Sequence, residues 1–289
     1  FTLIEIMIVV LTISILSSII YVASGGIRER GEFAKVLMFS EKLNSSLAEN
    51  VVGQWDFNEG TGSSVYDSSL NENTGTITGA TWETNQSNCI SGSCLSFNGT
   101  SDYVATKSFS LIPPALTYSA WIKSFNDGSH NTQTLISDAA QSNTVGYIFC
   151  YRSTNSLIWQ YARSGSTRSL FSASNFFLEY NDIFVHVVIM VDYDAKTYSV
   201  YRNGIIHSNG ELTETPSFPL ANRIKYFGTY SPTHTSKIVG IIDEVALYDR
   251  IISISNIKQN YFIGINNLFL KNQISKEEYS ERIKLAKNE

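Results

Sequence analysis

Val52-Gly53-Gln54-Trp55-Asp56-Phe57 stands where the pattern of the 289-residue sequence changes. From this point, clusters of Gly, Ser, Thr and Asn separate short runs that are rich in Val, Ile, Tyr, Trp and Phe. Turn-forming residues that alternate with β-branched and aromatic residues are typical of antiparallel strands. The pattern predicts strands at Val52–Phe57, Gly75–Ile77, Leu95–Phe97, Tyr103–Ala105, Leu116–Lys123, Thr134–Ser137, Gly146–Tyr151, Ser156–Tyr161, Phe184–Asp192, Thr197–Arg202, Lys225–Thr229 and Val239–Tyr248.

The number of expected strands indicates the architecture. About a dozen strands over roughly 200 residues are too many for one open sheet and favour a two-sheet sandwich. The dipeptide Asn203-Gly204 lies between two strand-like pieces and predicts a two-residue hairpin. An aromatic content of 12% and a charged content of 16% fit a β-rich body.

The sequence before this body begins with an apolar run, Phe1 to Ala23, whose single charged side chain is Glu5. About 20 apolar residues can span a bilayer as a helix. A carboxylate buried in such a segment costs several kcal/mol unless it is paired or protonated. The α-amino group of Phe1, from the same chain or a neighbouring chain, is the obvious partner. We expect one long helix with an apolar half over 1–24 and an amphipathic half over 27–50.

Phe1-Thr2-Leu3-Ile4-Glu5 followed by this run resembles the mature start of type IV pilins and of the pseudopilins of type II secretion. The resemblance covers roughly the first 50 residues. It implies a methylated Phe1 and a Glu5 that neutralises the N-terminus of an adjacent subunit in a filament. Many family members have a proline near position 22, where this chain has Val22. We therefore place any break of the helix near Gly25-Gly26, because glycine weakens helices.

A second resemblance covers about residues 51–260. The ordered motifs are similar to laminin-G-like domains of the concanavalin A-like jelly roll. They are Val52-Gly53-Gln54-Trp55-Asp56-Phe57, Tyr66-Asp67-Ser68-Ser69, Asn73-Thr74-Gly75-Thr76, Leu95-Ser96-Phe97-Asn98-Gly99, Tyr118-Ser119-Ala120-Trp121-Ile122, Tyr201-Arg202-Asn203-Gly204 and Ile241-Ile242-Asp243-Glu244-Val245.

This second resemblance implies a sandwich that binds glycans or proteins and often holds a structural Ca²⁺. The matching candidate ligands are Asp56, Asp67 and Asp243, with backbone carbonyls near Asn71 and Asn73. Carboxylate and carbonyl oxygens suit Ca²⁺. The alternative is that Asp67 only caps a turn and Asp243 only hydrogen-bonds a loop.

Three cysteines are present. Cys89 and Cys94 flank a turn-like tetrapeptide, and export to an oxidising space favours a disulfide between them. Cys150 lies in an apolar run and is expected to be a buried free thiol.

The sequence offers no pattern that indicates catalysis. Jelly-roll glycanases have a Glu-x-Asp-x-Glu strand with paired carboxylates, and this chain has none. We therefore expect no enzyme activity and no catalytic residue. The net charge of −5 and the absence of a basic patch argue against nucleic acid as a partner. Trp159 and Tyr161 alternate onto one strand face and are candidates for a glycan platform, the alternative being that they belong to the core.

The last residues form a separate pattern. Ser253–Phe262 predicts the short helix that closes such domains, and Ile265–Lys271 predicts another short helix. Ser275-Lys276-Glu277-Glu278 is a capping box that opens a further helix through Lys287. The expected fold class is therefore α+β. Its three parts are a helix over 1–50, a laminin-G-like sandwich over 51–262 and a helical hairpin over 263–289.

The two resemblances together predict a structural subunit of an extracellular type IV pilus-like filament. The subunit would wait in the cytoplasmic membrane and form a helical homo-oligomer on the cell surface. Its lectin-like head would bind a glycan or a cell-surface ligand. The alternatives are a minor pilin or type II pseudopilin, and a membrane-anchored carbohydrate-binding protein that never polymerises.

Overall fold

The computed structural model describes residues 51–288 apart from 111–113, 125–131, 139–145, 153–154, 164–165 and 215–221. Asn50–Glu289 form one compact unit that is separate from Phe1–Glu49. Among the described helices, none has both the length and the apolar character that crossing a membrane requires.

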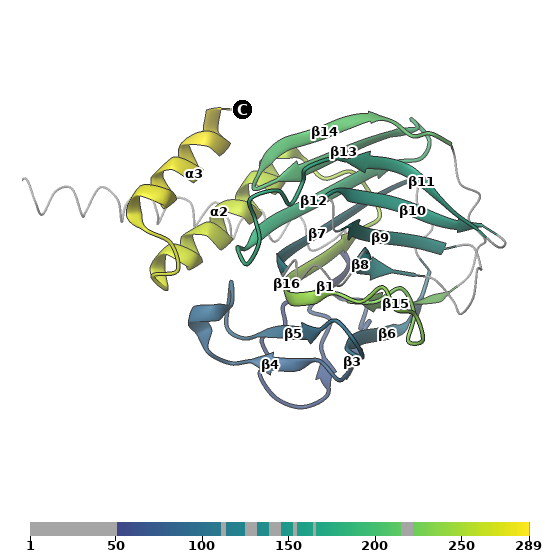
Figure 1. Cartoon of the computed structure of the whole chain (residues 1–289), viewed down its shortest axis with the longest axis horizontal. Coiled ribbons are helices and arrows are strands. Elements are labelled where there is room, and N and C mark those ends of the chain that lie inside the picture. The colour runs from purple at the N-terminus through teal and green to yellow at the C-terminus, as the bar shows by residue number, and fades with distance from the viewer. Residues whose placement is uncertain are drawn as a thin grey trace, which may run out of the picture. The chain divides into compact units, whose positions relative to one another are not determined.

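Within the described residues, two eight-stranded antiparallel sheets form a sandwich (Figure 1). Sheet A contains, in spatial order, β14 (Ile205–Glu211), β13 (Thr197–Arg202), β12 (Val185–Asp192), β7 (Ala115–Ser124), β16 (Val239–Tyr248), β5 (Cys94–Asn98) and β4 (Thr81–Glu83), and β1 (Val51–Trp55) pairs with β16. Sheet B contains β11 (Ser166–Ala173), β10 (Leu157–Arg163), β9 (Gly146–Arg152), β8 (Thr132–Ser137), β15 (Arg223–Phe227), β6 (Tyr103–Phe109), β3 (Gly75–Thr78) and β2 (Ser64–Val65).

The main hydrophobic core lies between the sheets. Alternate residues of a strand point to opposite faces, so Val185, Val187 and Ile189 of β12 enter this core together with Ala120 and Ile122 of β7. The intervening residues of these strands face the other side of sheet A. They are buried as well, because a second layer covers them.

Two C-terminal helices, α2 (Ile254–Leu270) and α3 (Lys276–Asn288), make this second layer, shown in yellow in Figure 1. Ser275 caps α3, since its Oγ accepts a hydrogen bond from the Glu278 N–H at 3.1 Å. A second hydrophobic core joins the helices to sheet A. It contains Trp121, Phe184 and Ile241 from the sandwich and Tyr261, Ile265 and Leu268 from α2.

Gly264 allows α2 to approach the sheet closely. A Cβ at this position would lie 2.2 Å from Cζ2 of Trp121, far inside van der Waals contact. The indole of Trp121 stacks on the ring of Tyr261 at 5.8 Å between centroids. The helices are therefore a packed part of the domain.

The expected α+β class is wrong. The described residues form a β-sandwich with two helices at its C-terminal end, and no long N-terminal helix is seen. The helix expected over 1–50 falls outside the described residues. The expected boundary between residues 262 and 263 falls inside α2, because the two helices expected around it form one continuous helix that Ser253 caps.

Candidate functional site

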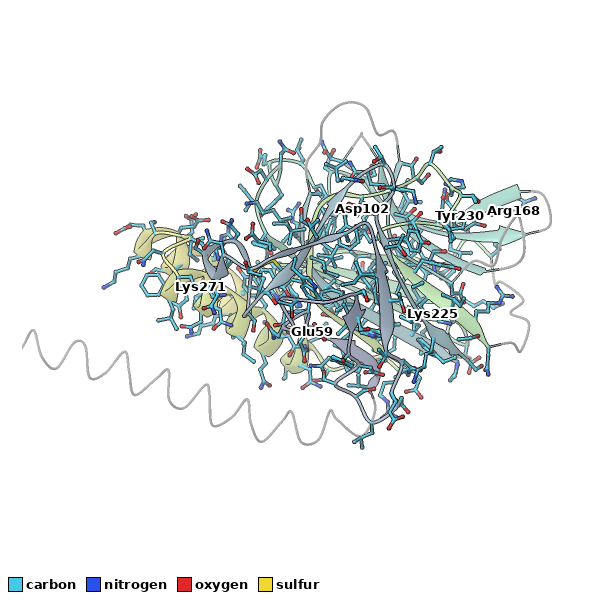
Figure 2. All side chains as sticks on the ribbon, turned by 90° about the horizontal axis from the view of Figure 1, so that it is seen from below. Glu59, Asp102, Arg168, Lys225, Tyr230 and Lys271 are labelled. Carbon is cyan, nitrogen blue, oxygen red and sulfur yellow. A yellow bond between two sulfur atoms is a disulfide. The ribbon has the colours of Figure 1, made fainter. Side chains whose placement is uncertain are left out.

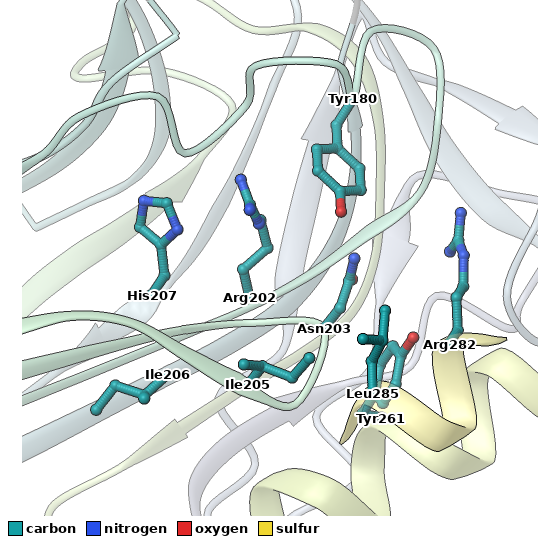
Figure 3. A pocket seen from close by; sticks show the side chains of 9 residues that line it. All are labelled: Tyr180, Arg202, Asn203, Ile205, Ile206, His207, Tyr261, Arg282 and Leu285. Atoms are coloured by element: carbon teal, nitrogen blue, oxygen red, sulfur yellow. The ribbon is translucent and has the colours of Figure 1, made fainter. Parts of the chain in front are cut away.

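A pocket of about 190 Å³ lies where the β13–β14 hairpin meets the C-terminal helices (Figure 3). We call it the hairpin–helix pocket. Figure 3 shows Tyr180 and Arg282 on one side and Arg202 and His207 on the other. Its nine lining residues are Tyr180, Arg202, Asn203, Ile205, Ile206, His207, Tyr261, Arg282 and Leu285.

The hairpin turn at Asn203-Gly204 forms one edge of the pocket and confirms the expected two-residue turn, since Arg202 pairs with Ile205 across it. Both turn residues have positive φ, 55° and 77°, as this type of turn requires. A Cβ at Gly204 would lie 3.0 Å from the ring of Tyr261. The glycine thus satisfies the turn and also lets α2 approach the hairpin.

Arg202 ties the hairpin to the turn over 174–180. Its Nη1 donates to the carbonyls of Phe176 at 2.8 Å and of Asn175 at 3.2 Å. The guanidinium lies 4.8 Å from the ring centroid of Tyr180, within cation–π range. This arrangement fixes the position of Tyr180 at the pocket.

The helices supply the opposite wall. Arg282 pairs with Glu278 one turn earlier, with 2.5 Å between Nη2 and Oε1. Burial raises the pKa of the Tyr261 hydroxyl, and the positive charge of Arg282 opposes this rise. Leu285 is 52% exposed and contributes an apolar rim.

Two histidines lie at and below the pocket. Burial lowers the pKa of His207, whose Nε2 lies 3.0 Å from the Ser174 carbonyl. His186 lies deeper, with its ring centroid 5.1 Å from that of Trp121 and 6.2 Å from that of Tyr261. Burial lowers its pKa to about 3. At neutral pH both imidazoles are therefore neutral, and the positive charge of the pocket comes from its arginines.

Cys89 and Cys94 form a disulfide, with 2.05 Å between the sulfur atoms. The loop that they close is held by the turn between the helices, because Lys271 Nζ donates to the carbonyls of Cys89 and Ile90 at 3.0 and 3.1 Å. Gln273 Nε2 also donates to the Cys89 carbonyl at 3.0 Å. Figure 2 shows Lys271 at the helical end of the body, far from Tyr230 and Arg168. The loop that the disulfide closes thus anchors the turn between α2 and α3.

Asp243 holds the same loop from β16. It is fully buried, and its carboxylate accepts hydrogen bonds from the N–H groups of Ile90 at 2.8 Å, Ser91 at 3.4 Å and Glu244 at 3.0 Å. Burial and the charge of Glu244 raise the pKa of Asp243. Burial and the charge of Asp56 raise the pKa of Glu244 to about 8.

Asp67 is used in the same way. Its carboxylate accepts from the N–H groups of Gln54, Ser69 and Asn73 at 2.8–2.9 Å. Asp56 accepts from the Gln54 side chain at 2.7 Å, and the Asn73 carbonyl accepts from Trp55 Nε1 at 3.0 Å. Oxygens surrounded by N–H donors are poor ligands for Ca²⁺, which needs six to eight free oxygens. These residues do not fit the expected calcium site.

Among the described residues, Asp243 and the sulfur atoms of Cys89 and Cys94 lie within 4.8 Å of one another. Sulfur atoms joined in a disulfide are not the thiolates that bind metals. This cluster therefore gives no metal site.

Trp159, one of the two residues expected to form a glycan platform, is not on the surface. Its side chain is 1% exposed and lies in the main core, which is the alternative that the sequence left open. Tyr161 lies on the same strand, β10, and its side chain is outside the described set. The side chain of Cys150 is outside this set too, as are Phe1 and Glu5.

No sequence motif predicts the hairpin–helix pocket. Its Asn203-Gly204 turn was expected, but the lining as a whole combines the turn over 174–180, strands β13 and β14, and helices α2 and α3. The fold and the pocket define the class of protein. It is a β-sandwich of the jelly-roll type with a small pocket between the β13–β14 hairpin and the C-terminal helices.

Comparison with known families agrees with this class. Residues 98–258 match the laminin G model of the concanavalin A-like lectin/glucanases superfamily, and the chain belongs to that superfamily. None of the curated proteins matches the chain.

Several solved structures share the fold. The botulinum neurotoxin serotype D binding domain is 17% identical with a TM-score of 0.59, covering 76% of this chain and 53% of its own. The binding domain of Paraclostridial Mosquitocidal Protein 1 is 17% identical with a TM-score of 0.58, covering 76% and 53%. The serotype D ligand-binding domain in complex with N-acetylneuraminic acid is 15% identical with a TM-score of 0.59, covering 76% and 52%. This chain thus spans about half the length of these neighbours, and the likeness concerns the fold.

Proposed function

We propose that the sandwich and its two helices form a lectin-like head that binds a glycan in the hairpin–helix pocket. The observation that carries this proposal is the pocket itself, in which aromatic, hydrogen-bonding and aliphatic side chains converge. Such a mixture is typical of small-ligand sites. Membership of a superfamily that includes lectins supports it, as does a structural neighbour solved with N-acetylneuraminic acid.

A binding role fits the pocket better than a catalytic one. Glycoside hydrolysis generally needs two carboxylates on either side of the scissile bond. The nine lining residues include no Asp or Glu. We therefore propose recognition of a glycan without its cleavage.

Glycan binding can be tested by applying the whole chain, in mild detergent, to a panel of immobilised glycans. Ile206 is 42% exposed at the pocket, so Ile206→Trp should fill the recess without disturbing the core. We expect binding to fall at least about tenfold, the loss of about 1.4 kcal/mol of binding free energy. Ile224→Trp is the matched control, since Ile224 is 38% exposed on β15 in the other sheet. Equal binding by both variants would place the site elsewhere, and no binding by any form would refute the lectin-like role.

We also propose that the head is carried on a pilus-like filament at the cell surface, with unassembled subunits held in the cytoplasmic membrane. The support is the motif Phe1-Thr2-Leu3-Ile4-Glu5 and the apolar run in which Glu5 is the single charge. An unpaired carboxylate in an apolar environment costs several kcal/mol. Pairing with the Phe1 amine of a neighbouring copy would offset this cost, and that pairing exists only in the assembled homo-oligomer.

Glu5→Gln tests this assembly role, because it keeps the size of the side chain and removes its charge. We expect filaments in the sheared surface fraction to disappear while the amount of chain in the membrane is unchanged. Glu32→Gln, in the same region, is the control and should still assemble. If the parent chain forms no filaments, the result would favour a membrane-anchored carbohydrate-binding protein. If it forms only a trace within filaments of another subunit, the result would favour a minor pilin or pseudopilin.

A further inference from the structure

The hydrogen-bond donors left over in the hairpin–helix pocket indicate the charge of its ligand. Resting on the glycan-binding function proposed above, we propose that the pocket selects sugars that carry a carboxylate, such as uronic or nonulosonic acids, over their neutral counterparts. Two arginines, a lining without Asp or Glu and an apolar rim support this selectivity.

Arg202 provides a positive charge that pairs with no carboxylate in the described part of the chain. Its Nη1 is used by the carbonyls of Asn175 and Phe176, and among the described residues it has no ion-pair partner. Its Nε and Nη2 donate to no described residue. A guanidinium held on one edge by carbonyls, with its other donors uncommitted, is suited to receive a carboxylate.

Arg282 provides a second incomplete set of donors from α3. Its Nη2 pairs with Glu278, whereas Nη1 is buried and has no hydrogen-bond partner among the described residues. A buried donor without an acceptor is costly, and a ligand oxygen could satisfy it after a small side-chain movement. Because Arg282 is paired with Glu278 and Arg202 has no ion-pair partner among the described residues, the lining has a net positive charge.

The rest of the lining suits one sugar ring. A volume of about 190 Å³ is below the range of roughly 300–1,000 Å³ that drug-sized ligands occupy. Ile205, Ile206 and Leu285 offer aliphatic surface for the C–H face of a ring, and Tyr180 offers a hydroxyl beside it. His207 is neutral at neutral pH, so charge recognition would come from the arginines.

The experiment compares matched sugars and matched variants by calorimetry on the full-length chain at low salt. The sugar pairs are glucuronate and glucose, galacturonate and galactose, and sialyl-lactose and lactose. Leu285→Glu places a negative charge on the exposed rim, and Leu285→Gln is its neutral counterpart of equal size. Neither change touches the core, because Leu285 is 52% exposed.

We expect at least one acidic sugar to bind more tightly than its neutral partner. Leu285→Glu should weaken that acidic sugar about fivefold more than Leu285→Gln does, and the difference should shrink in high salt. Equal affinity for both members of every pair, with no difference between the variants, would overturn charge selection while leaving glycan binding intact. Failure of every sugar to bind would refute the proposed function and this inference with it.

Discussion

Replacing Trp55 by alanine should lower the free energy of unfolding of the sandwich by about 3–5 kcal/mol. Trp55 is fully buried at the end of β1, and its ring meets Phe227 edge-on at 4.8 Å between centroids. Its Nε1 also donates to the Asn73 carbonyl at 3.0 Å. Truncation would leave a large cavity between the sheets and an acceptor without a donor.

Urea unfolding followed by circular dichroism measures this loss. Trp82→Ala is the matched control, because Trp82 lies on the edge strand β4 and is only partly buried, although its Nε1 also donates to a carbonyl, that of Gly62. Trp55→Phe keeps most of the ring, so it should cost less than the alanine change. If the Trp55 and Trp82 alanine variants lost equal stability, Trp55 would not be a centre of the core.

The strands that sequence could predict are those inside the sheets and β1, which pairs only with β16. The expected strands all correspond to observed ones, and Thr197–Arg202 and Val239–Tyr248 have the observed bounds. Three observed strands, β2, β4 and β11, had no prediction, and a fourth, β14, was expected only as the second arm of the Asn203-Gly204 hairpin. These four are the terminal strands of the two sheets. Edge strands pair on one side only, so a segment such as Ser166–Ala173 can be polar and still form a strand.

The site was less predictable, because the roles of its residues depend on tertiary contacts. The acidic residues Asp67 and Asp243 were expected as metal ligands, but backbone N–H groups surround both. A carboxylate that organises a loop and one that binds Ca²⁺ have the same sequence pattern. The disulfide was predictable because Cys89 and Cys94 are close in sequence. Arg202 and Arg282 are distant in sequence, and they line one pocket only because the β13–β14 hairpin and α3 are neighbours in the fold.

His186 and Glu244 should change the stability of the fold with pH in opposite directions. The pKa of His186 is lowered from 6.5 to about 3 by burial, so the unfolded chain binds a proton that the folded chain excludes between these values. This group therefore destabilises the fold as pH falls below 6.5. The pKa of Glu244 is raised from 4.5 to about 8, so the folded chain retains a proton that the unfolded chain releases. This second group stabilises the fold as pH falls from 8 to 4.5.

Between pH 6.5 and 4.5 the two contributions oppose each other, each with a slope of about 1.4 kcal/mol per pH unit. His186→Gln removes one of them, so its stability relative to the parent chain should rise by about this amount for each unit of acidification. Glu244→Gln removes the other, and its relative stability should fall by a similar amount over the same range. Urea unfolding in half-unit pH steps measures both differences. Contributions from groups that do not contact either residue cancel in the subtraction, whereas the Glu244→Gln difference includes the response of Asp243, whose pKa the charge of Glu244 raises. Curves that stay parallel to the parent would mean that neither group changes its proton affinity on folding. The packing of α2 over His186, and the loop that Asp243 and Glu244 hold, would then have to be more open to water than the structure shows.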